Sequence, residues 1–333
     1  MTTLRRIAGR EVFPVGLGCM GLTHAYGAPI PPEQAEAVLL GALDLGVTLF
    51  DTAALYSFGA NEELVGRVLA PHRDEIFLAS KCGIFRGPDG KRAIDGRPET
   101  LRRTCDESLA RLKTDVIDLY YLHRWDKSVP IEDSVGALAD MVRAGKVRAI
   151  GLSEVSAGTL RKAAAVHPIA AVQSEYSLWS RNAEIAVLAA CRELGAAFVA
   201  FSPVGRGFLA DGIPDIEGLA PRDIRRAMPR FQAESFRRNG ELMKPLRALA
   251  DRKGCSVSQL ALAWLLHQGD DIIPIPGTTS LDHLQDNVRA AEIELDQQSA
   301  SQLSAMFPRD AVTGARYPAA RQVEIDTEQY ASR

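Results

Sequence analysis

Asp51, Lys81 and His123 each lie at the end of a short apolar run of the sequence. Tyr56 lies five residues beyond Asp51, in the segment that follows the first of these runs. A tyrosine hydroxyl has a pKa of about 10, and a neighbouring ammonium group lowers that pKa by stabilising the tyrosinate. This combination of groups predicts that Tyr56 delivers a proton to a carbonyl oxygen, which is a step of general acid catalysis.

The other three groups would support that proton transfer. Asp51 would keep Lys81 charged and in place, and His123 could donate a hydrogen bond that orients the carbonyl oxygen. The carbonyl carbon then needs a hydride, so a nicotinamide cofactor is implied. Taken one at a time, the same residues have plainer interpretations: a helix cap, a solvated charge, a buried histidine and a packed ring. A second chemistry also fits, because Lys81 could attack a carbonyl carbon and form the Schiff base of a lyase.

Short apolar runs alternate with longer amphipathic segments along most of the chain, which is typical of an α/β fold with parallel strands. Eight strand-and-helix units predict a single (β/α)8 TIM barrel over residues 1–333, in which functional residues follow the C-terminal ends of the strands. A β-hairpin over 4–7 and 11–13 is expected to cap the barrel. Strands are expected at 15–18, 47–50, 76–79, 116–122, 147–152, 169–172, 197–201 and 272–275, and helices at 35–45, 62–69, from 98 onwards, 131–144, 156–166, 182–195, 241–253, 256–267 and 281–290.

Two long segments fall outside this alternation. The loop at 205–239 is rich in arginine, so it either folds over the site or forms a solvated surface. The tail at 305–333 either edges the site or contributes to a subunit interface.

Composition excludes several classes of function. The net charge of −3 without a basic patch argues against a nucleic-acid partner. The sequence shows no secretory signal and no apolar stretch long enough to span a bilayer, so we expect a cytoplasmic protein without membrane contact. The five cysteines form no CxxC motif and the six histidines are scattered, which predicts reduced thiols and no metal.

Several ordered blocks closely resemble the aldo-keto reductase family, between about residues 6 and 291. The three blocks around the candidate catalytic residues are FDTAALYSFGANEELVG, LASKCG and DLYYLHRWD. Further blocks are AIGLSEVS, AVQSEYSLWSR, FVAFSPVGRGFL and IIPIPGTTSLDHLQDN, and they look most like the microbial and plant branch of the family. The resemblance implies NADPH-dependent reduction of aldehydes and ketones to alcohols, with Asp51, Tyr56, Lys81 and His123 as a catalytic tetrad.

The same resemblance implies where the cofactor lies. Expected contacts run from the nicotinamide through the pyrophosphate to the adenosine at Ser153, Gln173, Phe201, Ser202, Pro203, Val204, Gly205, Arg206, Gly277, Thr278, Thr279, His283, Asp286 and Asn287. Gly18, Cys19 and Met20 are expected to approach the cofactor from the end of the first strand, with glycine allowing the close approach.

Three positions depart from the usual pattern of the family. Phe201 stands where tyrosine is common, which keeps ring stacking but loses a hydroxyl. His283 stands where many members carry an arginine for the 2′-phosphate, and Thr279 occupies a position that is often basic. A histidine carries only part of a charge near neutral pH, so NADPH is preferred but NADH remains possible.

A glycine motif from Gly16 to Gly21 matches the GxGxxG of dinucleotide-binding folds. A site of that kind needs a helix directly after the motif and an acidic residue about 20 positions further on, at the end of a strand. Here THAYGAPIPP follows the glycines and Asp44 falls within a predicted helix, so this interpretation is disfavoured.

The substrate itself is weakly encoded. Tyr26, Phe85, Trp125 and Trp179 follow strands and could wall a substrate site, or could simply pack. The implied partner is a small-molecule carbonyl compound, and the chain is expected to be a monomer or a homo-oligomer. A non-enzymatic alternative is a barrel that binds NADPH as a redox-sensing subunit, which the intact tetrad disfavours.

Overall fold

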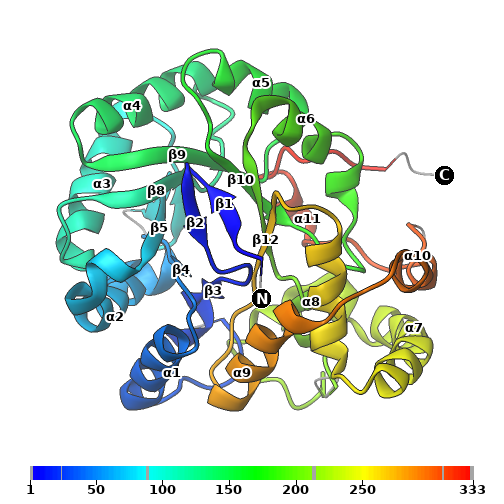
Figure 1. Cartoon of the computed structure of the whole chain (residues 1–333). Coiled ribbons are helices and arrows are strands. Elements are labelled where there is room, and N and C mark those ends of the chain that lie inside the picture. The colour runs from blue at the N-terminus through cyan, green and yellow to red at the C-terminus, as the bar shows by residue number, and fades with distance from the viewer. Residues whose placement is uncertain (1–2, 24, 88–89, 212–214, 310, 331–333) are drawn as a thin grey trace.

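Eight parallel strands form one sheet at the centre of the computed structural model, which describes residues 3–23, 25–87, 90–211, 215–309 and 311–330 (Figure 1). Their spatial order is β12-β11-β10-β9-β8-β5-β4-β3, so strands of this sheet that follow one another in the sequence lie side by side. The strands are β3 (Leu17–Gly18), β4 (Leu49–Asp51), β5 (Phe77–Cys82), β8 (Ile117–Leu122), β9 (Val147–Ser153), β10 (Ala171–Glu175), β11 (Ala197–Phe201) and β12 (Ile272–Ile275). Each predicted strand is present, and the TIM-barrel prediction is confirmed.

Two backbone hydrogen bonds close the sheet between its first and last strands. The amide of Gly16 donates to the carbonyl of Pro274 at 2.9 Å, and that of Gly18 donates to Pro276 at 3.1 Å. A Cβ on Gly18 would lie 2.8 Å from the carbonyl oxygen of Ile275, closer than real side chains come. Gly16 and Gly18 therefore allow the barrel to close, and the predicted approach of Gly18 to a cofactor stays a prediction.

Helices surround the sheet, and most begin and end where their capping residues predict. α1 and α3 open with a proline in the first turn, and Ser256 starts α8 with a capping box completed by Gln259. Gly254 ends α7 in the left-handed conformation that favours glycine. The helices are α1 (Pro32–Asp44), α2 (Ala60–Leu69), α3 (Pro98–Leu112), α4 (Ile131–Arg143), α5 (Ala157–Ala164), α6 (Val187–Leu194), α7 (Ala233–Lys253), α8 (Val257–His267), α9 (Leu281–Arg289), α10 (Gln297–Met306) and α11 (Ala319–Gln322).

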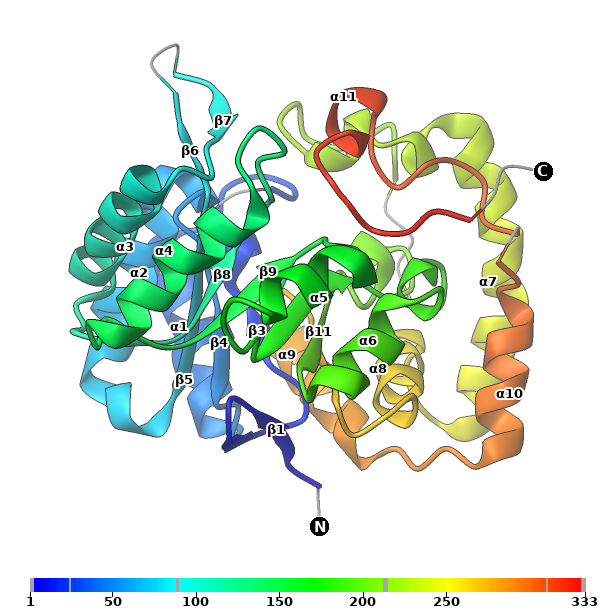
Figure 2. The same cartoon turned by 90° about the horizontal axis from the view of Figure 1, so that it is seen from above.

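The predicted N-terminal hairpin is confirmed as β1 (Arg5–Ile7) and β2 (Arg10–Val12). Ile7 and Val12 are buried in the same apolar cluster as Leu49 and Phe77 from the barrel strands. Figure 2 shows this hairpin at one end of the barrel, and a second hairpin, β6 (Ile84–Arg86) with β7 (Arg92–Ile94), at the other end. The first hairpin thus closes the end opposite the C-terminal strand ends.

Several elements differ from the sequence prediction. The β6–β7 hairpin, α10 and α11 were not predicted, and α7 begins at Ala233, inside the segment expected to be a loop. The helix predicted at 241–253 is the second part of α7, and its buried face packs through Met243 and Leu246. The helix expected from 182 is divided into a short 3-10 turn and α6, which starts only at Val187.

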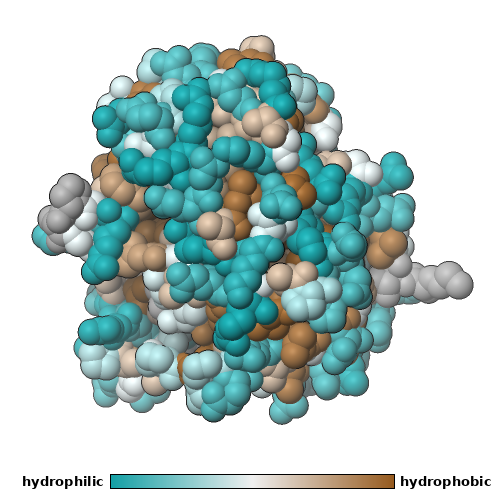
Figure 3. Space-filling view, turned by 90° about the vertical axis from the view of Figure 1, so that its left-hand side faces the viewer, coloured by the Kyte–Doolittle hydropathy of each residue, from teal (hydrophilic) through white to brown (hydrophobic). Residues whose placement is uncertain are grey.

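On the face drawn in Figure 3, hydrophobic residues are interspersed among hydrophilic ones. The larger exposed apolar side chains, such as Leu40, Val166 and Val323, come from separate parts of the chain. Within the described ranges, no helix combines the length and apolar character needed to cross a membrane.

Candidate active site

Three adjacent strands bring the predicted tetrad together. Asp51 is the last residue of β4, Lys81 lies near the end of β5, and His123 directly follows β8. Because β4, β5 and β8 are neighbours in the sheet, these three side chains meet at the C-terminal end of the barrel. Tyr56 opens a short 3-10 turn after β4, and its ring lies edge-on to His123 with 5.8 Å between ring centroids.

The Lys81 ammonium connects the other polar groups. Its Nζ donates to Oδ1 of Asp51, to the carbonyl oxygen of Thr52 at 2.7 Å and to the Tyr56 hydroxyl at 3.2 Å. Burial alone would lower the pKa of Lys81, but Asp51 and Tyr56 overcome this effect and hold the pKa above its ordinary value. Lys81 is therefore a buried, charged ammonium aimed at the tyrosine oxygen.

The turn that carries Tyr56 has an unusual backbone. Ser57 and Phe58 have φ values of 47° and 49°, in the left-handed region that non-glycine residues rarely occupy. The Ser57 hydroxyl donates to Thr23 at 3.0 Å, which ties the turn to the loop after β3. Such strain persists only where surrounding contacts enforce it, and it is common at functional sites.

Asn61 is a structural partner of the site that sequence reasoning missed. Its side-chain amide donates to the Cys19 carbonyl at 2.9 Å, and its oxygen accepts from the Thr52 hydroxyl at 2.6 Å. Asn61 is fully buried in the first turn of α2. The signal in the sequence was its place in the block FDTAALYSFGANEELVG, which also holds Asp51 and Tyr56. A buried amide has to be hydrogen-bonded, which explains why Asn61 holds the neighbouring segments together.

Burial changes the acid–base behaviour expected for Tyr56 and His123. Burial raises the pKa of Tyr56 and Lys81 lowers it, and the net direction is upward. The expectation that the ammonium would bring this pKa below its ordinary value is therefore wrong. Burial, with the positive charges of Arg124 and Lys81, holds the pKa of His123 well below its ordinary value, so the imidazole is neutral.

The next three strands place the residues expected at the nicotinamide. Ser153 ends β9 and lies directly opposite Gln173 in β10, while Phe201 ends β11. The Gln173 side-chain amide donates to Oδ2 of Asp51 at 2.7 Å, which ties this residue to the tetrad. Paired polar side chains beside a partly exposed aromatic ring suit a flat ring that carries a carboxamide. The residues present therefore fit the nicotinamide end of the implied cofactor.

The remaining residues predicted to contact the cofactor lie in the loops after β3, β11 and β12 and in α9. Ser280 caps α9 by accepting from the His283 amide at 3.4 Å, and the His283 side chain is exposed. Asp286 is already engaged, since it accepts from the hydroxyls of Ser256 at 2.5 Å and Ser258 at 2.8 Å. The other predicted cofactor contacts lie at or after the C-terminal ends of the strands or in α9, and their roles stay predictions. They are Gly18, Cys19, Met20, Ser202, Pro203, Val204, Gly205, Gly277, Thr278, Thr279 and Asn287.

Arg206 belongs to a buried ion cluster that the sequence analysis did not foresee. We call Glu154, Glu175, Arg206, Arg230 and Arg316 the arginine–glutamate cluster. Arg316 donates to Glu154 at 2.6 Å and to Glu175 at 3.2 Å, and Glu175 also lies 3.4 Å from Arg206. Although burial opposes ionisation, the guanidinium groups lower the pKa of Glu175 to about 2. The two carboxylates of this cluster are more than 20 positions apart in the sequence, so no local sequence pattern predicts the cluster.

The C-terminal tail lies across this end of the barrel (Figure 2). The Asp326 carboxylate accepts from the Ser156 amide at 3.1 Å and from the Thr159 hydroxyl at 2.6 Å. Lys127 Nζ donates to the carbonyls of Val323 and Ile325, each at 3.0 Å. Of the two interpretations of the tail, these contacts support the one in which it edges the site.

The candidate substrate walls fall into two groups. Tyr26 accepts from Arg206 at 3.3 Å, and Phe85 lies half-buried in the β6–β7 hairpin. Trp125 donates through its indole to the Val129 carbonyl at 2.9 Å and packs against the core. Trp179 is buried and stacks on Phe208 with 4.3 Å between centroids, so it serves packing.

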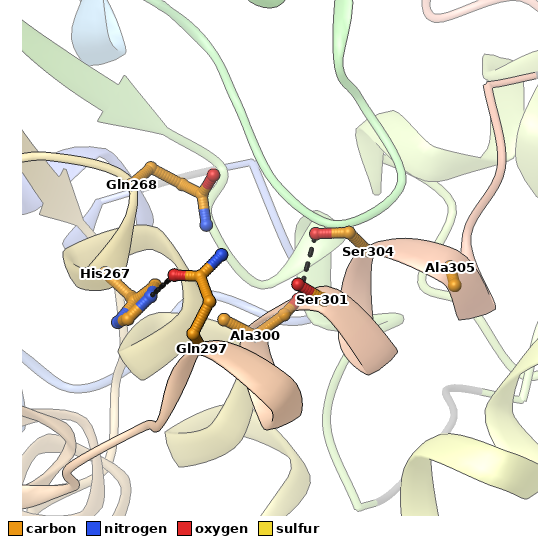
Figure 4. Close-up of a pocket in the computed structure, with 7 residues that line it drawn as sticks. All are labelled: His267, Gln268, Gln297, Ala300, Ser301, Ser304 and Ala305. Atoms are coloured by element: carbon orange, nitrogen blue, oxygen red, sulfur yellow. Dashed lines mark hydrogen bonds between the residues drawn. The ribbon is translucent and has the colours of Figure 1, made fainter.

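A cavity of about 490 Å³ lies between α8 and α10 and is lined by residues such as His267, Gln297 and Ser304 (Figure 4). No tetrad residue lines it, so it is separate from the candidate site. Among the described side chains, no group of three or more His, Cys, Asp or Glu residues is placed to hold a metal ion.

Comparisons with known proteins agree with this arrangement. Residues 14–307 match the model of the Aldo/keto reductase family. The chain is 45% identical over 312 residues to a probable aldo-keto reductase 1 of Glycine max, covering 93% of this chain and 89% of that protein. It is 43% identical over 331 residues to the aldo-keto reductase yakc [NADP(+)] of Schizosaccharomyces pombe, covering 97% of both.

Solved structures show the same fold. A glycerol dehydrogenase from Gluconobacter oxydans is 27% identical with a TM-score of 0.85, over 94% of this chain and 98% of the other. An aldo/keto reductase from Klebsiella pneumoniae in complex with NADP and acetate is 25% identical with a TM-score of 0.75, over 96% and 99%. With the family match spanning most of its length, this chain belongs to the aldo/keto reductase family.

Proposed function

We propose that this chain reduces aldehydes and ketones to alcohols with NADPH, and that Tyr56 donates the proton. The observation that carries this proposal is the contact between a charged lysine and the tyrosine, in which Lys81 Nζ lies 3.2 Å from the Tyr56 hydroxyl oxygen. Asp51 keeps that lysine charged, and the neutral His123 ring lies beside Tyr56.

When bound, the nicotinamide cofactor supplies the hydride that attacks the carbonyl carbon. As the carbonyl oxygen gains negative charge, the Tyr56 hydroxyl gives it a proton, and the product is an alcohol. Lys81 stabilises the tyrosinate that remains, because its ammonium already donates to that oxygen. The raised pKa of Tyr56 is compatible with this step, since an alkoxide oxygen is a stronger base than a phenolate oxygen.

His123 suits a positioning role better than an acid role. Its pKa lies well below the ordinary value, so it carries no proton to give as an imidazolium at neutral pH. A neutral imidazole can still donate one N–H hydrogen bond to the substrate oxygen and orient the carbonyl group. Its Nδ1 is buried without a hydrogen-bond partner among the described residues.

NADPH is the cofactor that the relatives support. The Schizosaccharomyces pombe relative is named for NADP(+), and the Klebsiella pneumoniae relative was solved with NADP and with NADPH. In this chain, Ser153 and Gln173 would hold the carboxamide, and Phe201 would stack on the ring. Thr278, with the first turn of α9, would approach the adenosine end, and NADH remains a weaker alternative.

The compartment and assembly state are also proposals. Five cysteines without disulfides suit the reducing cytoplasm. We place the protein there, as a monomer or homo-oligomer that takes a small-molecule carbonyl substrate. Light scattering coupled to gel filtration distinguishes the assembly states.

Loss of NADPH absorbance in the presence of an aldehyde panel tests the proposed function. The expected result is turnover with aromatic and aliphatic aldehydes and slower turnover with NADH. Borohydride trapping of a substrate on Lys81 without cofactor would instead support the Schiff-base lyase. Tight NADPH binding without turnover of any aldehyde would support the redox-sensing alternative.

A further inference from the structure

Arg124, the residue directly after His123, is a buried cation without an acidic partner. Its side chain is about nine-tenths buried. Its Nη1 donates to the His123 carbonyl at 2.6 Å and to the Ser153 hydroxyl at 3.3 Å. Within the part of the chain that the structure describes, no carboxylate lies within ion-pair distance of it. Burying an unpaired charge is costly, so such a group usually has a partner that binds.

The surroundings of Arg124 do not supply the missing negative charge. The arginine–glutamate cluster has three guanidinium groups and two carboxylates, and both carboxylates are already engaged within it. Tyr317 packs against the cluster, because its hydroxyl accepts from Arg206 at 3.4 Å and its ring lies beside Arg316. Burial raises the pKa of Tyr317 against the charges of Arg206, Arg124 and Arg316. Together, Arg124 and the cluster leave two positive charges uncompensated.

The phosphates of the cofactor are expected elsewhere. Arg124 follows β8 and contacts Ser153, which is expected at the nicotinamide carboxamide. The residues expected at the phosphates follow β11 and β12, three and four strands away in the sheet order. The nicotinamide ring itself offers no negative charge to a guanidinium. The remaining molecule at this end of the barrel is the carbonyl substrate.

We propose that Arg124 binds an anionic group of the substrate, so that the preferred substrates are aldehydes or ketones that also carry a carboxylate. This inference rests on the proposed carbonyl reduction. Its selectivity follows from charge-assisted hydrogen bonds, which are stronger than neutral ones and gain further from burial. Arg124 acts in substrate choice, while the tetrad carries the proton transfer.

The test compares two substrates that share a ring and a reacting aldehyde, 4-carboxybenzaldehyde and its neutral methyl ester, methyl 4-formylbenzoate. For the wild type, kcat/KM is expected to be about tenfold or more higher for the carboxylate, because an ion-paired hydrogen bond to a buried group is lost with the ester. For Arg124→Met, kcat/KM for the carboxylate should fall to about the value for the ester, so that their ratio drops to about one, with the loss in KM. Arg124→Lys should keep part of the preference, since charge remains without the planar fork.

Arg92→Met is the matched control. Arg92 also lies near enough to act on His123, but it already pairs with Glu324 at 2.6 Å. Its removal should leave the substrate ratio unchanged. The dissociation constant of NADPH, measured by fluorescence titration, should change less than about threefold in Arg124→Met. A loss of NADPH affinity on the order of tenfold would overturn the proposal by assigning Arg124 to the cofactor.

The outcomes separate this inference from the proposed function. If neither aldehyde is reduced, carbonyl reduction itself fails. If both are reduced equally by the wild type, or if Arg124→Met lowers both without changing their ratio, the enzyme stands and the anion site is overturned. An inhibition experiment on the wild type tests the proposal even if the Arg124→Met variant does not fold. Benzoate is expected to compete with methyl 4-formylbenzoate, and the neutral benzamide is not. Equal inhibition by the two would contradict the proposal.

Discussion

At the scale of single residues, burial and charge act against each other around Tyr56. Burial raises the pKa of Tyr56 and Lys81 opposes that rise, while His123 is driven toward its neutral form. The sequence indicated which groups meet, because three strand ends converge in a barrel. The sequence could not indicate whether burial or charge dominates the pKa of Tyr56, since the exposure of each group depends on the turn after β4 and on the neighbouring strands. The tyrosine is therefore a weaker acid at rest than its lysine neighbour suggested.

The pH dependence of carbonyl reduction follows from these directions. Tyr56 must be protonated to act, and its raised pKa keeps it protonated up to and beyond its ordinary value of about 10. His123 stays neutral through neutral pH because its pKa is depressed. The kcat for an aldehyde should thus vary less than about threefold between pH 6.5 and 9.5. A midpoint of activity loss below pH 9 would show that Lys81 outweighs burial at Tyr56.

Lys81→Met should affect both activity and stability. Tyr56 loses the ammonium that stabilises its anion, so activity is expected to fall on the order of 10²–10⁴-fold. Asp51 loses its buried ionic partner, which should cost about 3–5 kcal/mol of unfolding free energy. Urea denaturation and steady-state kinetics measure the two effects. The double variant with Asp51→Asn should recover stability without activity, and full activity in Lys81→Met would make the lysine a bystander.

His283→Arg tests the expected departure in cofactor preference. The exposed His283 side chain lies in the first turn of α9, where the 2′-phosphate is expected. A guanidinium fork binds phosphate better than an imidazole, so NADPH should bind on the order of tenfold more tightly. NADH lacks the 2′-phosphate and serves as the internal control. Titration of both cofactors into both proteins measures the effect, and equal changes for the two would place His283 away from the phosphate.

At the scale of elements, local sequence patterns predicted the strands and helices of the barrel. The position of the C-terminal tail and the arginine–glutamate cluster depend on contacts between distant parts of the chain. Strand and helix periodicity, with caps such as Ser256, was sufficient for the eight repeating units. The tail was ambiguous because its anchors lie far away in the chain, as in the contact of Asp326 with Ser156. The arginine–glutamate cluster could not be predicted from the sequence, because its members are far apart in the chain and only the fold brings Arg316 to Glu154.

Asp326→Ala should detach the tail from the loop before α5. The variant loses acceptors for the Ser156 amide and the Thr159 hydroxyl, which should cost about 1–3 kcal/mol. Limited proteolysis should cut the tail faster than in the wild type. Asp133→Ala removes an exposed carboxylate from α4 and is the control expected to change neither property. Unchanged proteolysis in Asp326→Ala would mean that other contacts hold the tail.

At the scale of the whole molecule, the two ends of the barrel serve different purposes. The β1–β2 hairpin fills one end with apolar side chains and closes the core. The other end gathers the tetrad, the arginine–glutamate cluster, the β6–β7 hairpin and the tail. The (β/α)8 arrangement explains this division, because loops after the strands can vary while the opposite end keeps the barrel stable. The central claim is that this variable end reduces carbonyls with Tyr56 as the proton donor.

The most direct test compares the wild type with Tyr56→Phe in the NADPH-dependent reduction of an aromatic aldehyde. The substitution removes one hydroxyl and keeps the buried ring, so NADPH affinity should stay within about threefold. Loss of the proton donor should lower kcat by about 10²–10⁴-fold, the usual contribution of general acid catalysis. A Tyr56→Phe enzyme that retained half of the wild-type kcat would contradict the account.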